Sequence, residues 1–174
     1  DVEFACYGVQ YRWQRDGDDA LAAAKPLWFT GQGTPEACEP LFAALFRRGD
    51  LSANDRVARL RLAMEAGNLR VAQSIAADLP GKDRIAERDF TEATRDPLRA
   101  LARGQFAFAT ASGRELALAA LERAARADAG KAREPWVRVR ERLPEADRRY
   151  GNARIAYHAA RQLDPAANDW FREA

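Results

Sequence analysis

The residue types that most often carry catalysis or bind metals are few and far apart in this chain. His158 is the only histidine, and neither Cys6 nor Cys38 has a second cysteine close by in the sequence. Zinc sites need clustered histidines and cysteines, and a serine nucleophile needs a histidine beside it. The sequence therefore predicts no metal site and no nucleophilic active site, and we interpret His158 as a packing or surface residue.

Two further motifs have simpler explanations than catalysis. The string TGQG at residues 30–33 contains two glycines, but no predicted strand precedes it, as a nucleotide-binding loop would require. The acidic pairs Asp18/Asp19 and Glu36/Glu39 fall at expected helix N-termini, where negative charge compensates the helix dipole. We therefore predict no bound cofactor and no catalytic residue in this chain.

Arginine supplies the most conspicuous charge pattern. All but three of the 28 lysine and arginine residues are arginine, and residues 131–154 hold seven of them, interleaved with acidic residues. A solvated, salt-bridged helix surface explains this pattern. The alternative is contact with an anionic polymer, for which we expect Arg138, Arg142 and Arg149 to be the contacts. The net charge of +2 does not favour nucleic acid as that polymer.

Composition and periodicity predict an all-α protein. Strong helix formers dominate, and alternating β-branched runs are missing. Helices are expected over 19–29, kinked or shortened at Pro26, and from Pro35 to Arg48. The second of these carries an apolar stripe of Leu41, Phe42, Leu45 and Phe46. No apolar run approaches the ~18 residues of a membrane span.

Glycines at 17, 49, 67, 104, 130 and 151 are expected to punctuate the helices. The helix that begins at Pro144 is expected either to break at Tyr150-Gly151 or to continue to Leu163. Their spacing is irregular, which argues against a strict repeat family. We predict a right-handed α-superhelix, or α-solenoid, of irregular antiparallel helix hairpins with about ten helices. Since no linker is visible, residues 1–174 are assigned to a single helical domain.

One set of residues also resembles a known family. Cys6-Tyr7, Trp13, the string WFTG at 28–31, Pro35, Ala37-Cys38 and Leu41-Phe42 are similar to the helical part of soluble lytic murein transglycosylases, and so is RLRLAMEAGN at 59–68. The likeness fades after Leu79-Pro80. It implies a U-shaped helical superhelix that lies beside a lysozyme-like catalytic domain in that family.

The resemblance has specific consequences. On residue type alone, two cysteines fit buried free thiols as well as a disulfide. The resemblance implies a structural Cys6–Cys38 disulfide and, with it, a periplasmic location. The family's catalytic glutamate is followed directly by serine, and this sequence contains no Glu-Ser pair. We therefore expect the catalytic domain to be absent and this segment itself not to be an enzyme.

The resemblance also sets the expected role and partners. It implies a segment of a longer protein, a scaffold that positions or restrains peptidoglycan glycan strands, with proteins of the cell-wall machinery as further partners. Asp1 rather than methionine opens the chain, and no signal peptide is present, as expected for a mature protein or a segment. The alternative is a tetratricopeptide-like module that binds a protein or peptide.

Overall fold

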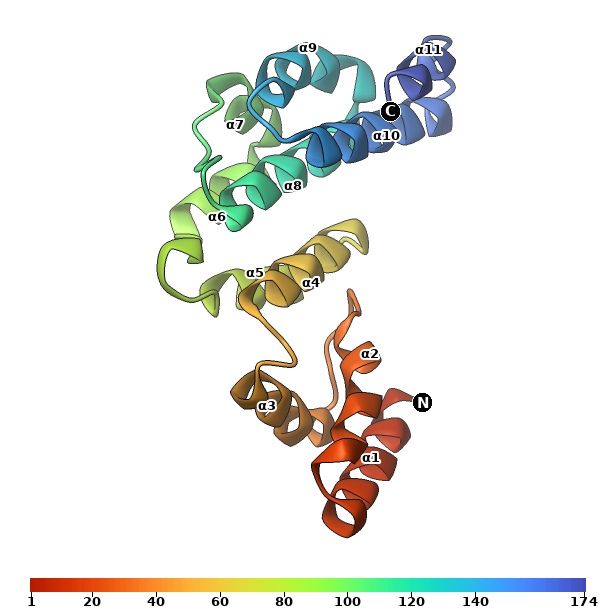
Figure 1. Cartoon of the computed structure of the whole chain (residues 1–174). Helices are drawn as coiled ribbons and strands as arrows, with labels where there is room; N and C mark the ends of the chain where they lie inside the picture. The colour runs from red at the N-terminus through yellow and green to blue at the C-terminus, as the bar shows by residue number, and fades with distance from the viewer. The chain divides into compact units, whose positions relative to one another are not determined.

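A computed structural model describes all 174 residues of the chain (Figure 1). It contains eleven α-helices, three short 3-10 segments and no β-strand, so the all-α prediction is confirmed. The chain divides into two compact units, Asp1–Ile75 and Ala76–Ala174. The boundary between the units falls within α5 (Leu69–Ala77).

In the first unit a disulfide joins α1 to the 3-10 turn that precedes α3. Cys6 lies on α1 (Val2–Asp16), and Cys38 ends the 3-10 turn Glu36–Cys38 that leads directly into α3 (Glu39–Arg48). The two Cα atoms are 5.1 Å apart, and both cysteines are fully buried. The structure thus contains the Cys6–Cys38 disulfide that the family resemblance implied.

The core of the first unit forms around the apolar stripe of α3. Leu41, Phe42 and Leu45 are buried there, as their spacing predicts. The indole of Trp28 packs edge-on against the rings of Phe42 and Phe46, with centroids 5.1 and 5.0 Å away. This aromatic cluster joins α3 to the segment that precedes the TGQG loop.

The sequence predicts one helix over residues 19–29, but the structure has two helices of different types there. A 3-10 helix covers Asp18–Ala24, and only α2 (Lys25–Trp28) is α-helical. Pro26 lies in the first turn of α2, where its missing N–H costs little. The α-helix is therefore short and has the proline in its first turn, so of the two expected effects of Pro26 the structure shows a shortened helix and no kink. The helix expected from Pro35 likewise begins later, at Glu39.

The second half of the first unit opens with α4 (Ala53–Glu65). Ser52 caps this helix in a complete capping box, because its hydroxyl accepts from the Asp55 N–H while the Asp55 carboxylate accepts from the Ser52 N–H. Arg59 of α4 is buried against Trp28, and its Nη2 donates to the Gln32 carbonyl oxygen at 3.3 Å. Burial, and to a lesser extent the neighbouring Arg56, lower the pKa of Arg59.

The second unit packs around α8 (Ala111–Ala127), which contacts four other helices of the unit. Leu118 and Leu121 of this helix are buried, and Trp136 of α9 (Ala129–Arg140) is completely buried. In Figure 1 this unit runs from green to blue. Its helices are α6 (Glu87–Arg95), α7 (Pro97–Arg103), α8 (Ala111–Ala127), α9 (Ala129–Arg140), α10 (Glu145–Arg161) and α11 (Ala167–Arg172).

Not every glycine in this series separates two helices. Gly49 and Gly104 do end helices, with the left-handed backbone that favours glycine. Gly130 instead lies in the first turn of α9, and Gly151 lies inside an unbroken α10. A Cβ atom at Gly151 would lie 2.3 Å from the ring of Trp136, so this glycine allows close helix packing.

Candidate functional site

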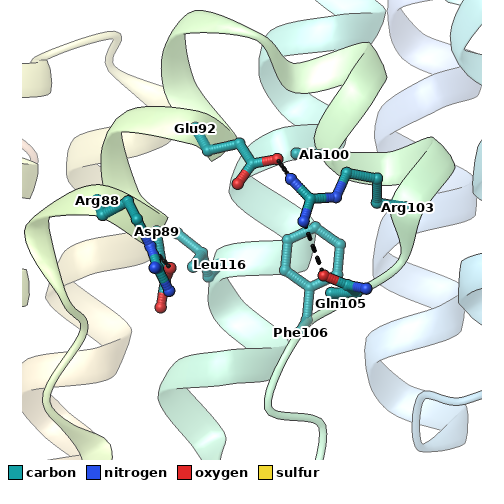
Figure 2. Close-up of a pocket in the computed structure, with 8 residues that line it drawn as sticks. All are labelled: Arg88, Asp89, Glu92, Ala100, Arg103, Gln105, Phe106 and Leu116. Atoms are coloured by element: carbon teal, nitrogen blue, oxygen red, sulfur yellow. Dashed lines mark hydrogen bonds and ion pairs between the residues drawn. The ribbon is translucent and has the colours of Figure 1, made fainter.

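A polar cavity opens in the second unit between α6, α7 and the segment that connects α7 to α8 (Figure 2). Its volume is about 300 Å³, at the lower end of the range of small-molecule pockets, ~300–1,000 Å³. The lining residues are Arg88, Asp89 and Glu92 of α6, Ala100 and Arg103 of α7, Gln105 and Phe106 of the connecting segment, and Leu116 of α8.

Helix ends bring the polar lining together. Asp96 separates α6 from α7. Gly104, whose backbone has the left-handed conformation, ends α7, so the chain turns back over the cavity. As a result, Arg103 Nη1 donates to Glu92 Oε1 at 2.7 Å, and Arg103 Nη2 donates to Gln105 Oε1 at 2.9 Å. Figure 2 shows this chain of three side chains along one wall of the cavity.

An aromatic ring forms the apolar part of the lining. Figure 2 shows the ring of Phe106 between Leu116 and the Gln105 amide. Phe106 packs edge-on against Phe108, with centroids 5.8 Å apart. The guanidinium of Arg142 in turn covers Phe108, 4.1 Å from its centroid. Neighbouring contacts therefore hold Phe106 in place.

The charges of the cavity balance one another. Its lining contains two arginines and two carboxylates, with Arg103 paired to Glu92 at 2.7 Å and Arg88 paired to Asp89 at 3.2 Å. A general acid for glycoside cleavage must donate a proton, whereas a carboxylate committed to a guanidinium accepts hydrogen bonds. The cavity is therefore suited to binding polar groups rather than to acid–base cleavage.

A smaller depression of about 70 Å³ adjoins the cavity. The two share Asp89, Gln105, Phe106 and Leu116 in their linings. The depression adds two cations, Lys82 and Arg84, for which the structure shows no ion pair. The site as a whole therefore passes from a charge-balanced cavity to a positively charged end.

The three arginines predicted to contact an anionic polymer lie in different surroundings. Arg138 is exposed and pairs with Glu134 one turn earlier, and Arg149 is exposed and pairs with Glu145 in the same way. Arg142 donates from Nη1 to the Gly104 carbonyl oxygen at 2.8 Å besides covering Phe108. Each of the three thus has a partner within the chain, and Arg142 supports the wall of the cavity.

A separate charged cluster is buried between α8 and α10. The Glu122 carboxylate accepts two hydrogen bonds from Arg154 at 2.9 Å and one from Arg126 at 3.0 Å, and it contacts His158 Nε2 at 2.9 Å. Burial raises the pKa of Glu122, but the hydrogen bonds from Arg154 and Arg126 outweigh burial and lower it below its ordinary value. His158 is a buried packing residue within this cluster, consistent with its interpretation from the sequence.

A second carboxylate with a lowered pKa lies at the C-terminal end of the unit. Hydrogen bonds from Arg133 and Arg140 lower the pKa of Glu173 to about 2. The side-chain amide of Asn152 also donates to the Glu173 carbonyl oxygen at 2.7 Å. These contacts attach the chain end to α9 and α10, so several arginines of residues 131–154 have structural partners.

The structure shows no sign of a metal centre or a membrane span. It has no group of three histidine, cysteine, aspartate or glutamate side chains placed to hold a metal ion. No helix combines the length and the apolar character that crossing a bilayer requires.

Comparison of the sequence with known proteins finds a partial match. The chain is 30% identical to the soluble lytic murein transglycosylase of Escherichia coli K12 over 133 residues, 76% of this chain and 21% of that protein. The enzyme of the same name from Salmonella typhimurium LT2 matches to the same extent. No protein-family model matches the chain. The predicted resemblance is confirmed, and the match spans about a fifth of the relatives' length.

Solved structures match almost the whole chain. An inactive variant of lytic transglycosylase Slt from Pseudomonas aeruginosa has a TM-score of 0.78 at 26% identity, covering 98% of this chain and 28% of that one. The 70-kDa soluble lytic transglycosylase in complex with bulgecin A has a TM-score of 0.68 at 25% identity, covering 99% and 29%. These likenesses confirm the predicted fold class, an α-solenoid of irregular helix hairpins.

Proposed function

We propose that residues 1–174 are a non-catalytic scaffold segment of a periplasmic peptidoglycan lytic transglycosylase. In this role the segment positions or restrains glycan strands beside a lysozyme-like catalytic domain. The observation that carries the proposal is the 133-residue match, which takes in most of this chain but only 21% of the E. coli enzyme. A match to about a fifth of the enzyme's length leaves room for a catalytic domain elsewhere in such a protein.

The carboxylates of the chain support a non-catalytic role. No glutamate is followed by serine, the pair that the resemblance associates with catalysis. Glu92 in the cavity is paired with Arg103, and the buried Glu122 is paired with Arg154 and Arg126. None of these glutamates is free to serve as the acid that glycosidic cleavage requires.

The disulfide supports a periplasmic location. Cys6 and Cys38 are bonded and buried, and the chain has no free cysteine. Stable structural disulfides form in oxidising compartments such as the bacterial periplasm and are rare in the cytosol. The proposed partner is therefore peptidoglycan, together with proteins of the cell-wall machinery.

Co-sedimentation with purified peptidoglycan sacculi tests this function directly. The chain should sediment with sacculi and release no anhydro-muropeptides into the supernatant, as measured by chromatography and mass spectrometry. Release of anhydro-muropeptides would refute the non-catalytic assignment. Failure to sediment at low salt would refute glycan binding by this segment.

A tetratricopeptide-like protein-binding module is the second candidate, and one observation favours it. On α1, Phe4, Tyr7 and Tyr11 are 79%, 54% and 63% exposed. Exposed aromatic side chains are enriched in protein interfaces. A Tyr7→Ser, Tyr11→Ser variant that still sediments with sacculi but no longer captures a cell-wall protein would favour this candidate.

A further inference from the structure

We infer that the cavity between α6 and α7 binds one sugar ring of a glycan strand, stacked on the face of Phe106. In this arrangement Glu92, Arg103 and Gln105 form hydrogen bonds with the hydroxyl groups of the ring. The inference rests on the proposed function and gives it a location that the sequence did not indicate.

The chemistry of the lining selects a neutral, hydroxyl-rich ligand. The two arginines and two carboxylates of the cavity balance in charge, which favours neither a strong anion nor a cation. Their planar side chains, with the Gln105 amide, offer both donors and acceptors at short range. The face of an aromatic ring such as Phe106 is weakly negative and attracts the C–H groups of a sugar.

The positively charged end indicates which glycan fits best. Lys82 and Arg84 line the depression beside Phe106, and no acidic side chain of the chain is paired with either of them. A sugar in the cavity that carries a carboxylate substituent would place that group near these two cations. A muropeptide, with its acidic peptide stem, should therefore bind more tightly than a neutral chito-oligosaccharide.

Contacts within the chain hold the cavity wall in place. The Phe106 segment is held by Phe108, by the stacked Arg142, and by Arg114, whose Nη1 donates to the Phe108 carbonyl oxygen at 3.1 Å. Such preorganisation lowers the entropy that binding must overcome. Because the cavity is open and its charged groups stay hydrated, we expect dissociation constants on the order of millimolar for a short oligosaccharide.

Two-dimensional NMR of the whole 174-residue chain tests the inference, with chitotriose as the neutral probe and a disaccharide-peptide from digested peptidoglycan as the acidic probe. Saturable shifts should appear at the backbone amides of Asp89, Gln105, Phe106 and Leu116 with both probes. The acidic probe should add shifts at Lys82 and Arg84. Shifts confined to other parts of the chain, or none with either probe, would overturn the inference.

A matched pair of phenylalanine variants separates stacking from general damage. Phe106→Ala removes the ring in the cavity and should weaken chitotriose binding by about three- to tenfold. Phe171→Ala removes an exposed ring from α11, outside the cavity, and should leave binding unchanged. Dispersed spectra confirm that each variant is folded. Glu92→Gln gives a second test that keeps the shape of the wall and should also weaken binding.

The outcomes distinguish this site from the proposed function. If wild-type protein sediments with sacculi but chitotriose and the muropeptide cause no shifts at the cavity, the site is wrong and the scaffold function stands. Equal affinity in wild type and in folded Phe106→Ala and Glu92→Gln variants would also refute the site. If wild-type protein neither sediments nor shifts, both proposals fail.

Discussion

Substitution of Glu122 by glutamine should destabilise the second unit strongly, because the carboxylate pairs with two arginines, Arg154 and Arg126. Glu122 is 3% exposed and accepts hydrogen bonds from Arg154 and Arg126. Removal of one partner from a buried ion pair costs about 3–5 kcal/mol. Because 23% of the Arg154 side chain and 42% of the Arg126 side chain stay exposed, we expect the lower end, about 3 kcal/mol.

Urea denaturation of the two units provides the measurement, with Glu134→Gln as the matched control. Glu134 makes the same kind of pair with Arg138, but its side chain is 83% exposed. An exposed pair of this spacing contributes only about 0.3–0.5 kcal/mol. Replacement of Arg154 by methionine together with Glu122→Gln should recover part of the loss, since the uncompensated charge is then removed. Equal losses in Glu122→Gln and Glu134→Gln would refute the reasoning.

The same carboxylate gives a prediction for acid. Its pKa is lowered on folding, so the unfolded chain binds the proton more readily. The stabilisation is complete above the ordinary glutamate pKa and is lost as the pH falls below it towards the lowered pKa of the folded state. Wild-type stability should therefore decline more steeply than that of Glu122→Gln on acidification below about pH 4.5. Parallel declines would assign the acid sensitivity to other groups, such as Glu173.

Three further predictions follow from packing. Reduction of the Cys6–Cys38 disulfide, which closes a 32-residue separation, should lower the stability of the first unit by roughly 3–4 kcal/mol in the chain-entropy model, as measured by denaturation with and without reductant. Gly151→Ala should cost about 1–3 kcal/mol despite better helix propensity, because its Cβ would meet the buried ring of Trp136, and an unchanged midpoint would contradict this. Arg142→Ala should lower the free energy of unfolding by about 1–2 kcal/mol, because the contacts with Gly104 and Phe108 are lost. Arg138→Ala and Arg149→Ala should each lower it by less than about 0.5 kcal/mol, because their ion pairs are exposed.

Local sequence rules predict much of the fold. The apolar stripe of α3 is buried, and Ser52 caps α4 three residues before its capping-box partner Asp55. Both features depend on residues within a few positions of each other, which is the range over which periodicity and capping operate. Local rules could not predict the Cys6–Cys38 disulfide, because its two cysteines are 32 positions apart in the sequence. That prediction followed only from the family resemblance.

Glycine illustrates where local rules fail. Gly104 ends a helix in a left-handed backbone conformation that suits glycine. Gly151 lies inside a helix, and glycine is needed there because Trp136 leaves no room for a side chain. Gly113 is also inside a helix, where a Cβ would meet the Ala107 carbonyl oxygen at 2.2 Å. The two roles use the same residue type, but one depends on a left-handed backbone and the other on what lies across the packed interface. A single sequence contains no information on that partner until the helices are placed.

The cavity lies beyond sequence prediction for a related reason. Glu92 and Arg103 are separated by a helix break, and their meeting depends on the angle at which α7 leaves α6. The sequence directed attention to residues 131–154, where arginines are dense, but density alone does not distinguish a ligand contact from an internal one. Arg142 is an internal contact of this kind. It donates to the Gly104 carbonyl oxygen and covers Phe108, and so it supports the cavity wall. Arg142, which the sequence predicts to bind glycan directly, would then affect binding by positioning Phe106. Its replacement should weaken chitotriose binding without removing a direct contact.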